Sequence, residues 1–68
     1  MNRPKLMAEV MLRQTTLRKI AEAIGVAPNT MSLKVNGHRQ FDAREIRLIA
    51  EYLQITDPAK VVEIFIFD

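Results

Sequence analysis

The sequence predicts an all-α fold organised as a single domain over residues 1–68. Apolar side chains recur three and four positions apart along almost the whole chain, and this spacing places them on one face of a helix. Prolines, glycines and capping side chains divide the pattern into five segments. A chain of 68 residues suits one small domain, and an apolar content of 49% is enough for one packed core.

Two helices are expected in the first third of the chain. The first covers about residues 4–13, because Pro4 suits a first turn in which its missing N–H group would have no partner. The second follows the capping hydroxyls of Thr15 and Thr16 and ends at Gly25. The apolar faces comprise Leu6, Met7, Val10 and Met11 in the first helix and Leu17, Ile20, Ala21 and Ile24 in the second.

A short and unusually polar third helix is expected over residues 28–35. Pro28 suits its first turn, and the pair Asn36 and Gly37 suits the left-handed conformation that stops a helix. Phe41, in the polar loop that follows, is expected to pack against the core beneath that loop.

The last two helices have clear start signals. Asp42, followed three residues later by Glu45, matches a capping box, and Asp57 before Pro58 opens the final helix. The apolar face behind the capping box comprises Ile46, Ile49, Ala50 and Leu53. Residues 61–67 contain β-branched and aromatic side chains that suit a strand, but the start signals favour a helix to about Phe65.

The charge of the chain is small in total but unevenly distributed. The net charge is +2, whereas residues 1–40 carry +5 from seven basic and two acidic side chains. Residues 41–68 carry −3 from three basic and six acidic side chains. A basic half suggests a polyanion such as nucleic acid as a partner, although charges spread over solvated helix faces are the more common explanation.

Composition argues against several classes of protein. Cysteine is absent and His38 is the only histidine, so neither a disulfide framework nor a Cys or His metal cluster is expected. The sequence has neither a Cys–His pair nor a phosphate-binding glycine loop, so it gives no sign of an enzyme. Charges interrupt every stretch before the ~20 apolar residues of a membrane span, and the first residues do not resemble a signal peptide. We therefore expect a cytoplasmic protein without catalytic activity, cofactor, metal, small-molecule substrate or membrane contact.

The stretch from residue 16 to residue 37 holds the most informative pattern. Ala21 is small enough to let the next helix cross closely, and Gly25 suits a sharp turn. Val26 and Met31 are placed to fill the angle between the two helices. A close crossing through a turn of three or four residues is the geometry of a helix-turn-helix.

On these residues the chain resembles the Cro/repressor-type helix-turn-helix regulators of phages and bacteria. The resemblance extends from about Lys5 to Phe65, and residues 16–26 and 30–37 carry most of it. It implies a compact five-helix, lambda-repressor-like DNA-binding domain with the helix-turn-helix at the second and third helices. It also implies a small transcriptional regulator that places its third helix in the major groove of double-stranded DNA.

The chain departs from the family pattern at three positions. Leu17 stands where relatives often have a glutamine that touches a phosphate, and Ala27 stands where a serine commonly caps the third helix. The capping contribution, about 1 kcal/mol, is then lost unless another group supplies it. The family's usual apolar residue is replaced by Lys34, so we expect Val35 to take over the core contact and Lys34 to be free to point toward DNA.

The resemblance assigns candidate DNA contacts. Residues near the start of a recognition helix reach base edges, and Asn29 has the side chain that pairs bidentately with adenine, while Leu33 could pack on a thymine methyl. A helix-start residue facing water and an ordinary exposed leucine are the alternative interpretations. The candidate base-edge residues are Pro28, Asn29, Ser32 and Leu33, next to Ala27. The candidate phosphate contacts are Thr16, Arg18, Thr30, Lys34, Asn36, His38, Arg39 and Gln40.

Two functions from different classes remain open. The first is sequence-specific DNA binding by a homodimer on a two-fold operator, with half-sites about one helical turn apart. Residues 64–67 motivate the dimer, and completion of the core is the alternative role for them. The second is a protein-binding antirepressor or modulator that engages a partner repressor, because Ala27, Pro28 and Leu33 make the expected reading face only weakly polar.

Overall fold

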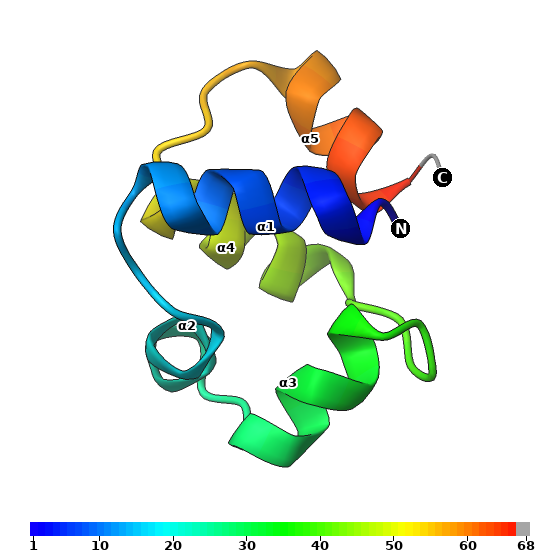
Figure 1. Ribbon diagram of the computed structural model, residues 1–68. Helices are drawn as coiled ribbons and strands as arrows, with labels where there is room; N and C mark the ends of the chain where they lie inside the picture. Colours follow the sequence, from blue (N-terminus) through cyan, green and yellow to red (C-terminus); the bar gives the residue numbers. More distant parts are fainter. Residues whose placement is uncertain (67–68) are drawn as a thin grey trace.

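The computed structural model describes residues 1–66, and over that part the chain forms α-helices and no strand (Figure 1). The helices are α1 (Arg3–Leu12), α2 (Leu17–Ile24), α3 (Pro28–Val35), α4 (Ala43–Tyr52) and α5 (Pro58–Phe65). The expected all-α class is confirmed for the described residues, and so is a final segment that is helical to Phe65. None of the helices described is long and apolar enough to cross a membrane.

Side chains cap four of these helices, and at α2, α4 and α5 the capping residue is one that the sequence predicted. Asn2 Oδ1 accepts a hydrogen bond from Lys5 N, and Thr16 Oγ1 accepts one from Lys19 N, each at 3.1 Å. Asp57 Oδ1 accepts one from Ala59 N at 3.0 Å. At α4 the capping box is complete, whereas α3 begins after Ala27 without any side-chain cap, as the sequence predicted. The helix ends are therefore set by local hydrogen bonding.

A single apolar core joins the five helices. In Figure 1, α1 crosses the front of the molecule with α4 behind it, α5 above, and α2 and α3 below. The two ends of the helical array meet, because Asn2 N donates a hydrogen bond to Ile64 O at 2.7 Å. The buried apolar cluster comprises Leu6, Val10, Ile20, Ala21, Ile24, Met31, Val35, Ile49, Leu53, Ile64 and Phe65.

Helix α1 buries a different set of side chains from the one that its apolar spacing predicts. Met11 is 76% exposed, so its assignment to the buried stripe is wrong. Glu9 is 5% exposed and lies on the inner side instead. The Nζ atom of Lys60 in α5 lies 2.6 Å from Glu9 Oε1 and supplies the counter-charge that a buried carboxylate needs. This ion pair joins the inner side of α1 to α5.

Two of the four C-terminal apolar residues complete the core. Ile64 is 1% exposed and Phe65 is 8% exposed, whereas Ile66 is 60% exposed. Phe41 packs against the same cluster, edge-on to Phe65 with ring centroids 5.7 Å apart, so its expected place beneath the loop is confirmed. Phe67, the fourth apolar residue, lies outside the described residues.

Candidate nucleic-acid interface

A three-residue connection, residues 25–27, joins α2 to α3. Gly25 adopts the left-handed conformation with φ +77°, and its N–H donates to Glu22 O at 3.3 Å. Val26 N donates to Ala21 O at 2.9 Å, which closes the end of α2. Apart from Gly25 and its two chain neighbours, nothing lies within 4 Å of the position that a Cβ would take at this residue. Glycine is therefore favoured there by the backbone conformation and not by lack of space.

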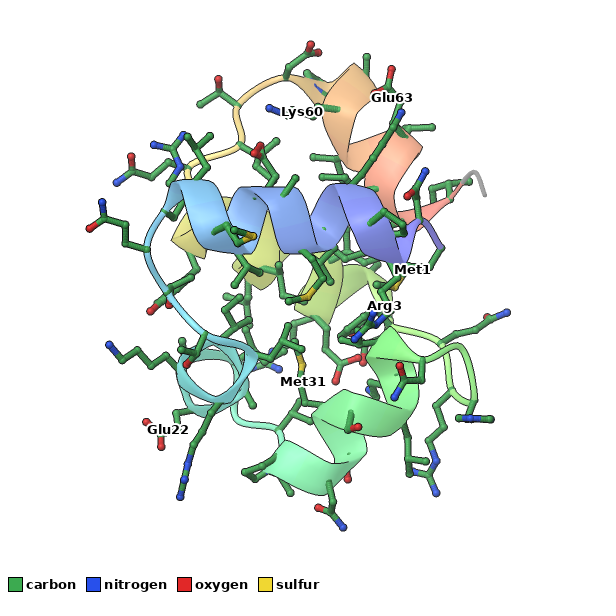
Figure 2. The ribbon with its side chains drawn as sticks, viewed as in Figure 1. Met1, Arg3, Glu22, Met31, Lys60 and Glu63 are labelled. Carbon is green, nitrogen blue, oxygen red and sulfur yellow. The ribbon has the colours of Figure 1, made fainter. Side chains whose placement is uncertain are left out.

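Helix α3 is set against α2 by its buried residues. In Figure 1, α2 is seen nearly end-on while α3 runs across the view, so the two helices cross steeply. Met31 and Val35 are 1% and 3% exposed, and Figure 2 shows Met31 directed from α3 into the interior. Ala21 is fully buried at this crossing. The side of α3 opposite Met31 faces solvent.

The exposed side of α3 carries the predicted base-edge residues. Pro28, Asn29, Ser32 and Leu33 are all exposed. They stand at the first, second, fifth and sixth positions of α3, so they share a strip of its surface. No side chain caps the start of the helix and no acidic residue lies in its first turn. Its first N–H groups are therefore open to an external acceptor.

The predicted phosphate contacts come from the segments before and after this strip. Arg18, Asn36, His38, Arg39 and Gln40 are exposed, and Thr30 is half-buried. Other roles already engage two of the polar side chains, since the exposed Thr16 caps α2 and Asn36 Nδ2 donates to Ser32 Oγ at 3.3 Å. Within residues 1–66, neither Arg18 nor Arg39 takes part in a salt bridge. Both guanidinium groups are thus available to an anion.

Lys34 does not belong to this exposed set. Its Nζ atom lies 2.5 Å from Glu45 Oε1 and 2.6 Å from Glu45 Oε2. The Lys34 side chain is 13% exposed, so the prediction that it is free to point toward DNA is wrong. Its position explains the difference: Lys34 and Val35 stand three and four residues after Met31, and both therefore lie on the inner side of α3. The apolar role of Val35 is confirmed.

Sequence reasoning missed the role of Glu45. The sequence assigns this residue only to the capping box of α4, yet it is also buried, at 6% exposed. It completes the capping box, accepting from Asp42 N at 2.9 Å, and also binds Lys34. The capping box was visible in the sequence and placed Glu45 at the start of α4. The partner from α3 was not visible, because only the fold brings residues 34 and 45 together.

The surface offers hydrogen-bond donors and cations, a combination that suits an acceptor-rich polyanion. Among residues 1–66, no group of three or more His, Cys, Asp or Glu side chains is placed to hold a metal ion. Comparison of the chain with protein-family models, with curated proteins and with solved structures gave no match.

Proposed function

We propose that this protein is a small transcriptional regulator that binds double-stranded DNA in a sequence-specific manner. In this proposal α2 and α3 form a helix-turn-helix of the Cro/repressor type, and α3 enters the major groove. As a regulator of the phage and bacterial type, it would act in the cytoplasm. The observation that carries the proposal is the division of α3 into a buried side and an exposed side that carries Asn29, Ser32 and Leu33.

The local geometry of the α2–α3 pair supports this proposal. A three-residue turn with a left-handed glycine and a steep helix crossing are the features of a helix-turn-helix. The open N-terminus of α3 points its N–H groups outward, where base or phosphate acceptors could bind. Arg18 in the first turn of α2 and Arg39 after α3 are the exposed cations that would contact the DNA backbone.

A homodimer is part of the proposal. Two copies related by a two-fold axis would place their α3 helices in successive major grooves, about 34 Å apart. An apolar surface groove of about 460 Å³ between α4 and α5 offers a face for the second copy. The groove is lined by Ala43, Ile46, Arg47, Ala50, Thr56, Pro58, Val61 and Val62.

Selection of bound sites from a random duplex library tests the proposal. The wild type should enrich a two-fold symmetric sequence, because a symmetric dimer reads two equal half-sites. In the same selection, Asn29→Ala should relax the preference at one base of each half-site, equivalent to about 1–3 kcal/mol. Glu51→Ala, an exposed substitution on α4 outside this groove, serves as the control and should leave the selected sequence unchanged. Failure of the wild type to enrich any sequence would refute sequence-specific binding.

A specific observation favours a second candidate, a protein-binding antirepressor or modulator that engages a partner repressor. Met11 and Leu12 are 76% and 63% exposed at the end of α1, and DNA binding through α3 gives them no role. Exposed apolar side chains of this size are typical of protein interfaces when they cluster. In that case duplex DNA would show no salt-sensitive binding, whereas substitution of Met11 and Leu12 by serine would abolish binding to a repressor partner.

A further inference from the structure

Lys34 and Glu45 form a buried charged link between α3 and α4. Both carboxylate oxygens of Glu45 lie within 2.6 Å of Lys34 Nζ, and the two side chains are 13% and 8% exposed. Glu45 Oε1 also accepts the hydrogen bond from Asp42 N that completes the capping box of α4. The carboxylate is therefore held in place from its own helix while it binds the lysine of another.

Aromatic contacts extend this link to α5. Lys34 Nζ lies 5.8 Å from the centroid of the Phe41 ring, within the range of a cation–π interaction. The Phe41 ring stands edge-on to Phe65 at an interplanar angle of 87°. The last turn of α3 is thus connected to α4 and α5 through one set of side chains, namely Lys34, Glu45, Phe41 and Phe65.

Helix α3 needs such a link because its remaining contacts with the core are apolar. It has eight residues, packs mainly on α2, and contributes Met31 and Val35 to the core. Apolar contacts are non-directional, so two such residues restrain the depth of the helix more strongly than its rotation. The energy of a buried ion pair in which both carboxylate oxygens contact the lysine depends on direction and distance, so such a pair also restrains rotation.

We propose that the Lys34–Glu45 pair is a positioning device that fixes the orientation of α3 and so aims the strip that carries Asn29 and Ser32. This inference rests on the proposed DNA-binding function and deepens it, because it names residues that govern specificity without touching DNA. Lys34 and Glu45 act through the helix that they hold. Loss of the pair leaves α3 folded but lets it rotate on α2, and a rotated strip discriminates poorly between base sequences.

Three variants separate positioning from stability. Glu45→Gln keeps the acceptor that the capping box requires but removes the charge that holds Lys34. Lys34→Met removes the cation and leaves the Glu45 carboxylate without its counter-charge, hydrogen-bonded only to Asp42 N. The double variant Lys34→Met/Glu45→Gln leaves no uncompensated charge in the interior, so its unfolding midpoint should stay within about 4 °C of that of the wild type. Arg44→Gln, an exposed charge change beside Glu45, is the matched control.

Two measurements on the full chain decide the matter. Backbone residual dipolar couplings of the free protein report the orientation of α3 relative to the other helices. We expect the couplings of α3 to change in Glu45→Gln and in the double variant, while those of the other helices and of Arg44→Gln stay at wild-type values. The ratio of affinities for the selected duplex and a scrambled duplex should fall about tenfold in the double variant, the size of coupling typical of one hydrogen-bonded network.

The outcomes are distinct. Wild-type α3 couplings in the folded double variant would overturn the inference, and so would changed couplings with an unchanged affinity ratio. If the double variant does not fold, Glu45→Gln is judged by the same two criteria. If the wild type binds no duplex at all, the proposed function fails. The α3 couplings of the variants then still show whether the Lys34–Glu45 pair orients this helix.

Discussion

At the scale of single residues, the backbone conformation of Gly25 controls how α2 gives way to α3. Gly25 has φ +77°, and the space that a Cβ would enter is open to 4 Å, so a larger residue meets conformational cost alone. Gly25→Ala should therefore lower the free energy of unfolding by about 1 kcal/mol. Gly25→Asn should cost less, because asparagine tolerates the left-handed region better than alanine does.

Chemical denaturation of the wild type and both variants checks this prediction through the denaturation midpoints at constant slope. The order of stability should be wild type, then Gly25→Asn, then Gly25→Ala. An alanine variant as stable as the wild type would show that the turn does not need a left-handed residue. The α2–α3 geometry described above would then lack its main local cause.

Lys34 shows where reasoning from single residues reaches its limit. The sequence places Met31, Lys34 and Val35 on one side of α3, and the burial of Val35 in the core follows from that spacing. Burial of Lys34 does not follow, because a lysine enters an interior only when a counter-charge is supplied. That counter-charge, Glu45, lies eleven positions away on another helix. Exposure of Asn29, Ser32 and Leu33, by contrast, could be predicted from the spacing alone.

At the scale of elements, α3 begins without a side-chain cap. Ala27 already has the extended backbone of an N-cap residue, with φ −64° and ψ 147°. Ala27→Ser should place a hydroxyl on the uncapped N–H groups and raise the free energy of unfolding by about 1 kcal/mol. Thermal unfolding of the free protein measures the gain.

Ala23→Ser is the matched control for this change. Ala23 is exposed inside α2, where serine is a poorer helix former than alanine, so the same substitution should lower stability by roughly 0.5 kcal/mol. Opposite signs for the two variants indicate that capping is the cause. A loss of stability in Ala27→Ser would mean that another group already satisfies the start of α3.

The helices could be predicted well because their signals are local. The predicted caps Thr16, Asp42 and Asp57 bind N–H groups within three residues, and α3 lacks a side-chain cap as predicted; the cap at Asn2 was not predicted. The inner face of α1 could not be predicted in full, because Glu9 is buried only where Lys60 of α5 reaches it. Apolar spacing assigned Met11 to the core, but that residue is exposed.

At the scale of the whole molecule, ion pairs neutralise some of the charges that are separated along the sequence. Every salt bridge among residues 1–66 joins the basic first part of the chain to the acidic second part. The pairs are Lys5 with Glu63, Glu9 with Lys60, and Lys34 with Glu45. The cations of the α2–α3 region that remain outside these pairs are Arg18, Lys19 and Arg39. Attraction of the α2–α3 surface to a polyanion should therefore depend on these three side chains.

The central claim is that the α2–α3 surface binds duplex DNA, and the salt dependence of that binding tests it most directly. Titration of a duplex with the wild type at several salt concentrations should give a plot of log K against log[salt] with a slope of about −2 or steeper per protomer. Arg39→Ala should make the slope shallower by about 0.9, whereas Arg13→Ala, which removes an exposed arginine at the end of α1 that donates to Gln54, should leave it unchanged. An absence of binding, or a slope indistinguishable from zero, would contradict the claim.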